Sequence, residues 1–352
     1  MNDVATNPLL GQTIMALDTP ALIVDLDVVE ANIARIAKLC RDNGVNWRPH
    51  VKGNKTVEIV HRELAAGAIG ITCAKVGEAE VMVAAGVRSI LIANEIVGAS
   101  KIARLLAWQA RAEVMVGIDS VANCGPIAAA AERAGVAPGA PVVVLANAVA
   151  GMKGVRLAGL MTWESQAVGI VDPAEKARVV GEAVALITAS ADACRKAGHR
   201  IDIVSCGGSG TLPYCTMQPG ITEIEAGGAI FSDVLYREKY HLDFPPALHV
   251  LASVTSRPTP TRIILDAGKK AMSSDGAVPA PVGLAAAHGA KLSAEHATVE
   301  LKAPSDTPAV GDKVLFVVGY GDTTVHLHEE IVATRDGRIE AIWPVAARGR
   351  IK

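Results

Sequence analysis

Two kinds of segment alternate along this chain, and this alternation is the feature that most limits its fold. From about residue 20 to residue 230, short runs rich in Val and Ile are separated by longer Ala-rich segments whose apolar residues recur at helical spacing. Strands separated by helices predict βαβ units and a parallel sheet, and enough of them in series predict a (β/α)8 barrel, the TIM barrel. The expected strands are Ala21–Asp27, Asn46–Lys52, Gly70–Val76, Ser89–Glu95, Glu113–Asp119, Arg156–Trp163, Ile201–Gly207 and Thr222–Gly227.

The pattern changes after about residue 245. Short strands follow one another there with turn signals between them, which is typical of an antiparallel β domain. We therefore expect residues 1–27 to be an N-terminal segment that pairs with the β domain, residues 28–245 to form the barrel, and residues 246–352 to form the β domain. The expected strands of this domain are Val250–Ser256, Arg262–Asp266, Lys291–Leu301, Asp312–Val318, Thr324–Ala333 and Arg338–Pro344.

The barrel pattern is one strand short if Ala21–Asp27 belongs to the β domain. A helix, a strand and another helix should fit between Asp119 and Arg156. Val142–Leu145 could be the strand, but the residues that remain before Arg156 are barely the ~10–12 of a crossover helix. We expect that a barrel strand is missing near residues 136–141, or that the barrel is irregular there.

Composition excludes several classes of function. The 352 residues carry a net charge of −2 and only 3% aromatic residues, which argues against nucleic-acid binding. The six cysteines form no C-x-x-C pair, as expected of free thiols in a reducing compartment. We see no signal peptide and no apolar run of the ~18–20 residues that span a membrane, so we expect a cytoplasmic protein.

A lysine ends the expected strand Asn46–Lys52, and His50 lies two residues before it. Period-2 alternation places both side chains on the same face. Strands often end in Lys for solubility, so this feature alone decides nothing. In a barrel, however, active sites gather at the carboxyl ends of strands, where a lysine can bind an aldehyde cofactor as an imine.

Two glycine clusters follow the last two barrel strands, at 207–211 and 226–228. Glycine lets backbone N–H groups turn towards an anion, and Ser209 and Thr211 add hydroxyl donors. One such loop would be an ordinary turn, but two beside a strand-end lysine favour a phosphate site. A phosphate together with an imine-forming lysine indicates pyridoxal 5′-phosphate.

At this point the chain resembles a known family, the D-threonine aldolase / D-serine dehydratase family, which has the alanine-racemase-type, fold-type III pyridoxal-phosphate fold. The matching motifs run in the family's order over nearly the whole chain. They are Arg48–Lys52, Cys73–Glu80, Asn94-Glu95, Gly159–Glu164, Cys206–Thr211, Glu225–Asp233, Asp266–Lys270 and Trp343–Gly349.

The resemblance implies that Lys52 carries the cofactor and that Glu164 is an acid–base residue facing the substrate. The proton of the β-hydroxyl would be removed by Glu164 or by a metal-bound hydroxyl assisted by His50, although Glu164 could instead form a structural salt bridge. The resemblance also implies a homodimer with a small amino-acid substrate, in which the β domain closes over the barrel. Family members usually have a Glu-x-Asp-x-Gly strand followed by an Arg that contacts the cofactor ring, and this is the strand that we do not find. The implied cofactor contacts are Arg48, Lys52, Gly208, Ser209, Gly210, Thr211, Gly227 and Gly228.

The family's metal site is altered in this chain. Aldolases of the family have a His-x-Asp pair in the β domain and dehydratases a His-x-Cys pair, whereas Tyr320 and Asp322 stand here. Tyrosine is a poor ligand at neutral pH because its phenol ionises only at pH ~10. His326 and His328, expected on one face of a strand, could complete a site for Mn²⁺, Mg²⁺ or Zn²⁺ with Asp322, or could be structural.

The resemblance implies a lyase that cleaves D-β-hydroxy-α-amino acids by a retro-aldol reaction, as a D-threonine aldolase does. Asp322, where a dehydratase has Cys, favours the aldolase over a D-serine or D-hydroxy-amino-acid dehydratase. An amino-acid racemase using Tyr320 opposite Lys52, and a non-catalytic pyridoxal-phosphate-binding protein, are further alternatives. The last is usually a bare barrel, so the β domain argues against it.

Overall fold

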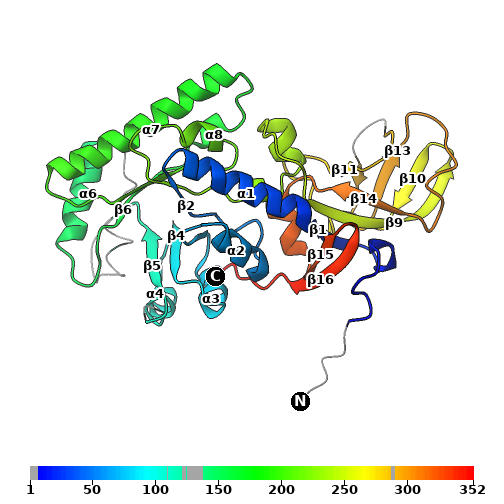
Figure 1. Cartoon of the computed structure of the whole chain (residues 1–352), viewed down its shortest axis with the longest axis horizontal. Helices are drawn as coiled ribbons and strands as arrows, with labels where there is room; N and C mark the ends of the chain where they lie inside the picture. The colour runs from blue at the N-terminus through cyan, green and yellow to red at the C-terminus, as the bar shows by residue number, and fades with distance from the viewer. Residues whose placement is uncertain (1–6, 109, 121–123, 125–137, 287–289) are drawn as a thin grey trace, which may run out of the picture. The chain divides into compact units, whose positions relative to one another are not determined.

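A computed structural model describes residues 7–108, 110–120, 124, 138–286 and 290–352. The chain forms two compact units (Figure 1). We call one the β unit, which comprises Met1–Ile33, Gly53–Glu58 and Gly228–Arg348. The other is the barrel unit, which comprises Ala34–Lys52, Ile59–Gly227 and Gly349–Lys352. The long interruptions in both lists show that the chain passes between the units several times.

The barrel unit contains parallel strands in two sheets. One sheet has the order β3-β4-β5 and the other the order β2-β8-β7-β6, and a single bridge from His50 to Thr72 continues from the β2 segment to β3. In the described chain, β5 pairs only with β4, and β6 pairs only with β7. The strands are β2 Asn46–Trp47, β3 Ile71–Cys73, β4 Ser89–Glu95, β5 Glu113–Gly117, β6 Gly159–Met161, β7 Ile203–Cys206 and β8 Glu223–Ile224.

Helices alternate with these strands because their apolar residues recur at helical spacing. In α1, Val29, Ile33, Ile36 and Cys40 are buried at intervals of three or four residues. Helix α7 is the longest helix, and the Asp172 side chain caps its first turn by accepting a bond from the Glu175 N–H at 2.7 Å. The helices are α1 Leu26–Asp42, α2 Val57–Ala65, α3 Val76–Ala84, α4 Ala99–Leu106, α6 Ala140–Ala150, α7 Pro173–Lys196 and α8 Leu212–Cys215.

The possible strand Val142–Leu145 was wrong, because these residues lie inside helix α6. The valines there favour a strand locally. Pro141, however, lies in the first turn of α6, where a backbone N–H would have no acceptor within the helix, so proline is tolerated there, and the Ala residues that follow favour a helix. The expected missing strand near 136–141 falls partly on Val136 and Ala137, which lie outside the described residues. Residues 138–141 form a turn and the start of α6.

The β unit is built on a mostly antiparallel sheet with the order β12-β13-β10-β9-β1-β15-β16, and β14 also pairs with β9 and β11. Strand β1, at the start of the chain, runs antiparallel to β9 and parallel to β15 (Figure 1). The strands are β1 Ala21–Asp25, β9 Leu248–Thr259, β10 Arg262–Leu265, β11 Ala280–Pro281, β12 Lys291–Leu292, β13 Ala297–Glu300, β14 Lys313–Val317, β15 Glu330–Arg335 and β16 Arg338–Pro344.

Two strand predictions in the β unit were partly wrong. Lys291–Leu301 divides into β12 and β13, which pair with each other, because a turn at Ser293–His296 reverses the chain. Thr324–Ala333 begins as helix, with α9 at Gly321–Thr324 and a 3₁₀ turn at Val325–Leu327, and becomes β15 only from Glu330. This places His326 and His328 before the strand.

We expect loss of the α7 cap to weaken the barrel unit. Replacing Asp172 by Ala leaves the Glu175 N–H without its acceptor and should lower the free energy of unfolding by about 1 kcal/mol. Urea denaturation followed by circular dichroism measures this change. Asp192→Ala, at an exposed position of the same helix, is the matched control and should cost less than about 0.5 kcal/mol. Equal losses in both variants would contradict the capping role.

Candidate active site at the carboxyl ends of the barrel strands

Lys52 lies in a turn just beyond the segment that extends β2. The backbone before it is extended, since the His50 N–H donates to the Glu225 carbonyl at 3.0 Å and the Val51 N–H to the Thr72 carbonyl at 2.8 Å. Lys52 is half-buried, and its Nζ lies 5.6 Å from the centre of the Trp163 ring. A cation at this distance interacts favourably with the ring face. The lysine therefore has a defined place at the carboxyl ends of the strands.

His50 is tied to Lys52 through the backbone. The Lys52 N–H donates to His50 Nδ1 at 3.3 Å, so in the neutral ring the proton is on Nε2. The peptide of His50 also lies against Gly227, where a Cβ atom would overlap the His50 carbonyl oxygen. Only glycine allows this approach, and the approach holds the ends of the β2 segment and β8 together.

The first glycine loop, residues 207–211, follows β7 and leads into α8. Gly207 has a φ of +83°, and the Thr211 N–H closes the turn by donating to the Gly208 carbonyl at 3.1 Å. A Cβ atom on Gly208 would lie 2.8 Å from Trp163 Nε1. Ser209 and Thr211 are buried. The glycines thus allow the loop to turn tightly and to pack directly against Trp163.

Glu164 holds this loop. Its side chain is 1% exposed, and its carboxylate accepts hydrogen bonds from the Thr211 hydroxyl, from Cys215 Sγ at 3.1 Å and from the Gly207 N–H at 3.4 Å. A hydrogen bond with Cys206, burial and the charge of Glu164 raise the pKa of the Cys215 thiol well above its usual range, so Cys215 is a neutral donor. The Glu164 carboxylate is therefore already engaged by hydrogen bonds from the glycine loop and from α8.

Beneath these residues lies a buried polar network that the sequence did not reveal. Arg48 is 3% exposed and donates through Nε to Glu223 Oε2 at 2.9 Å and through a terminal nitrogen to the Ser89 hydroxyl at 2.9 Å. Ser205 Oγ donates to Glu225 Oε1 at 2.8 Å. These contacts place Arg48 inside the barrel wall, so its expected contact with the cofactor has no support in this geometry. The spacing of Glu223 and Glu225, two residues apart along the expected strand Thr222–Gly227, was the signal available in the sequence.

Burial raises the pKa of the Glu225 carboxyl to about 7, opposed by its bond from Ser205 and reinforced by the charge of Glu223. The carboxyl is thus neutral in the folded protein at pH values where it is ionised in the unfolded chain. The contribution of Glu225 to the free energy of unfolding is therefore fully present below pH 4.5, the usual pKa, and it is lost as the pH rises to about 7.

We expect Glu225→Gln to remove this pH dependence. Between pH 4.5 and 7, the free energy of unfolding of the wild type should fall, relative to the variant, by about 1.4 kcal/mol for each pH unit at most. Chemical denaturation of both proteins at a series of pH values measures the difference. Parallel curves for the two proteins would show that Glu225 does not titrate in this way.

In the β unit, Tyr320 and Asp322 form a pair, with the Tyr320 hydroxyl donating to Asp322 Oδ2 at 3.0 Å. Burial, together with Asp322, raises the pKa of Tyr320. Asp233 lies nearby, where it accepts bonds from the Gly321 N–H at 2.6 Å and the Tyr236 N–H at 2.9 Å, and burial raises its pKa to about 7. Tyr320 therefore stays a phenol, which is a poor metal ligand.

The proposed ligand set Asp322, His326 and His328 is not assembled. His326 is exposed on the 3₁₀ turn, and the ring Nε2 of His328 is bonded to the Ala271 carbonyl at 2.7 Å. Among the described residues, the one group of three side chains that could share a metal ion lies elsewhere. The strand on which the two histidines were to share a face begins only at Glu330. These residues do not fit a divalent metal.

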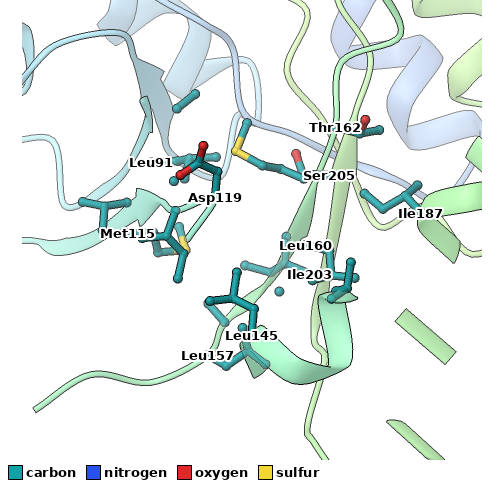
Figure 2. Close-up of a pocket in the computed structure, with 18 of the residues that line it drawn as sticks. Leu91, Met115, Asp119, Leu145, Leu157, Leu160, Thr162, Ile187, Ile203 and Ser205 are labelled. Carbon is teal, nitrogen blue, oxygen red and sulfur yellow. The ribbon is translucent and has the colours of Figure 1, made fainter. Parts of the chain in front are cut away.

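A cavity of about 1040 Å³ opens in the barrel unit, with walls from both β5 and β6 (Figure 2). Asp119, Thr162 and Ser205 provide polar groups, and Figure 2 shows Leu145 and Leu157 away from them. The remaining walls are mainly apolar and include Leu91, Met115, Leu160, Ile187 and Ile203. In the described chain, β5 pairs only with β4 and β6 only with β7, and residues of both β5 and β6 line this cavity.

The fold and these strand ends together are those of an α/β barrel with a lysine at one strand end and an added β domain. The family described as "Alanine racemase, N-terminal domain" matches residues 24–234, and "Putative serine dehydratase domain" matches residues 247–334. The chain belongs to the alanine-racemase-type family of pyridoxal-phosphate enzymes, as the motifs predicted, and this confirms the fold class, an α/β barrel followed by an antiparallel β domain.

Curated relatives cover nearly the whole chain. A D-threonine aldolase of Arthrobacter sp. is 33% identical, covering 96% of this chain and 95% of the relative. A 3-hydroxy-D-aspartate aldolase of Paracoccus denitrificans (strain Pd 1222) is 31% identical, covering 95% and 93%. The first alignment runs over 359 positions, more than the 352 residues of this chain, so that relative has residues that this chain lacks.

Solved structures agree with the curated relatives. The D-threonine aldolase of Filomicrobium marinum superposes with a TM-score of 0.91 and 32% identity, covering 97% of this chain and 98% of that one. The D-threo-3-hydroxyaspartate dehydratase of Delftia sp. HT23 gives a TM-score of 0.84 and 26% identity, covering 94% and 98%. Within the described part of this chain, no helix is long and apolar enough to cross a membrane.

The barrel unit fits pyridoxal 5′-phosphate. Lys52 is a strand-end amine in a half-buried position, and the glycine loop 207–211 lies beside Trp163, the ring that faces its Nζ. Ser209 and Gly210 are the further loop residues expected to contact a phosphate, whereas the Thr211 N–H and hydroxyl donate to the Gly208 carbonyl and to Glu164. Gly228, the last expected phosphate contact, belongs to the β unit, where a Cβ atom would overlap the Tyr236 hydroxyl.

Proposed function

We propose that the protein is a pyridoxal-phosphate-dependent lyase that cleaves D-β-hydroxy-α-amino acids between Cα and Cβ, giving glycine and an aldehyde. The observation that carries this proposal is Lys52 at the carboxyl end of the β2 segment, in a chain 33% identical to a D-threonine aldolase over 96% of its length. Two 3-hydroxy-D-aspartate aldolases of similar identity and coverage support it.

The reaction needs three things from its site. A group must accept the proton of the β-hydroxyl, the electrons of the broken bond must be stabilised, and a proton must reach Cα. When bound, the cofactor supplies the electron sink. The protein must therefore hold the cofactor, position the substrate and move one proton from oxygen to carbon.

Lys52 serves both the first and the last of these steps in our proposal. Its Nζ would hold the cofactor, and once the amine of the substrate binds the cofactor instead, Nζ would be an amine beside the reacting centre. An amine can accept the β-hydroxyl proton and return it to Cα. The Trp163 ring face beside Nζ keeps the side chain in place in both states.

His50 and Glu164 have supporting roles in this proposal. The Lys52 N–H fixes the His50 ring with its proton on Nε2, so His50 can donate a hydrogen bond to an oxygen of the substrate. Glu164 is occupied by Thr211, Cys215 and Gly207, and we assign it to holding the phosphate loop. The earlier expectation that Glu164 transfers a proton stays a prediction.

A dehydratase is the second candidate, because a D-threo-3-hydroxyaspartate dehydratase of Delftia sp. is 31% identical over 76% of this chain. Loss of water from the same substrates would give a 2-oxo acid and ammonia. The aldolases cover more of the chain, and Asp322 takes the place where the family's dehydratases have cysteine, so we favour carbon–carbon cleavage.

Products from D-threonine distinguish the candidates. We expect acetaldehyde and glycine in equal amounts, because cleavage between Cα and Cβ releases both. Chromatography of derivatised products with added pyridoxal 5′-phosphate measures them, and L-threonine is the matched control. Formation of 2-oxobutyrate would instead identify a dehydratase, formation of the L-isomer a racemase, and no product a binding protein.

Absorbance tests the cofactor anchor separately. The purified protein with pyridoxal 5′-phosphate should show the absorption band of a protein-bound imine, and Lys52→Ala should lose both this band and the aldolase activity, since no other amine would take its place. Lys55→Ala, three residues further on, is the control and should keep the band. A band that persists in Lys52→Ala would contradict the assignment.

We also propose that the enzyme works as a cytoplasmic homodimer. All six cysteines are buried free thiols, which suits a reducing compartment. The dimer rests on the family resemblance alone, in which the β domain of one subunit commonly closes the barrel of another. Light scattering after size-exclusion chromatography measures the mass, and a monomer of full activity would contradict this part of the proposal.

A further inference from the structure

A second group of metal-ligating side chains lies in the barrel unit, apart from the residues expected to bind metal. Cys206 is the last residue of β7, Cys215 is the last residue of α8, and Glu164 follows β6. One ligand atom from each lies within 4.8 Å of the others, and all three side chains are buried. The two cysteines stand at either end of the segment that contains the 207–211 loop.

We propose that Glu164, Cys206 and Cys215 bind a thiophilic divalent cation, of which Zn²⁺ is the best match. Two sulfurs and one carboxylate oxygen are a soft to borderline donor set, which suits Zn²⁺ and not Mg²⁺ or Ca²⁺. Around a tetrahedral zinc ion, such atoms lie about 3.5–3.8 Å apart. Cys215 Sγ and Glu164 Oε1 are 3.1 Å apart, and all three ligand atoms lie within 4.8 Å of one another, so changes of about 1 Å or less in these separations would complete the geometry.

The balance of charge is also suitable. Glu164 has hydrogen bonds but no ion pair in the described part of the chain, so no charged side chain competes with a metal ion for its buried carboxylate. On binding, the S–H bonds of both cysteines break, two S–Zn bonds form, and two protons pass to solvent. The cation replaces two protons, so the net charge of the buried group does not change, and no oxidant or reductant is needed.

A fourth ligand is at hand in the same place. The Thr211 hydroxyl already donates to Glu164 Oε1. The hydroxyl oxygen of Thr211, or a water molecule, could fill the remaining tetrahedral position. The ion would then join β7, α8 and the residue after β6 around the glycine loop. We infer a structural role, in which the metal fixes the shape of the loop that we assign to the cofactor phosphate.

Metal content of the full-length protein tests the proposal. The chain is produced in zinc-supplemented medium and dialysed against a chelator, which should remove a closed site's ion only slowly because all three ligands are buried. Mass spectrometry of elements should find one zinc ion per chain. Cys206→Ser with Cys215→Ser should lose it, whereas Cys194→Ser, a buried cysteine in α7, and Asp322→Asn in the β unit should keep it.

X-ray absorption of the wild type makes the result independent of how the variants fold. Its zinc edge should report two sulfur ligands and one or two oxygens. Less than a tenth of a zinc ion per chain, a site with no sulfur, or equal zinc in the double cysteine variant would overturn the proposal. Cofactor binding is not used in either measurement, so the outcome does not depend on the aldolase assignment.

Discussion

The contact between Gly227 and the His50 peptide is the constraint on which the rest of the site depends. It brings the end of β8 against the β2 segment so closely that no side chain fits between them. Hydrogen bonds from His50 to Glu225 and from Val51 to Thr72 extend the same segment between its neighbours. Because Lys52 is the next residue, its place follows from this backbone contact and not from side-chain packing of its own.

A buried polar layer supports these strand ends from within. Arg48, Glu223, Ser205 and Glu225 form a chain of bonds across neighbouring strands, and Glu164 joins the next loop to the end of β6. Such groups are stable in a low-dielectric interior only when each is paired, so they fix the relative positions of the strands that carry them. The glycine loop and the lysine are thus positioned by groups that do not themselves react.

Local patterns in the sequence predicted most of the strands and helices, because apolar periodicity reports which face of an element is buried. They failed where the same residues suit two structures. The valines after Pro141 read as a strand but form α6, and Thr324–Leu327 turn as helix before β15 begins. The site was found through Lys52 and its glycine loops, whereas the Glu223 and Glu225 network depends on which strands become neighbours.

By itself, the sequence determined the family and the order of the elements and singled out Lys52 as the candidate cofactor anchor, since these depend on local motifs and their spacing. Only the tertiary structure decided what surrounds each group. Glu164 is hydrogen-bonded to the glycine loop, and Arg48 forms a buried ion pair with Glu223. Among the described residues, His326 and His328 belong to no group that could share a metal ion, whereas Cys206 lies close to Cys215 and Glu164. These outcomes depend on distances between residues far apart in the chain, and residue type and spacing do not report such distances.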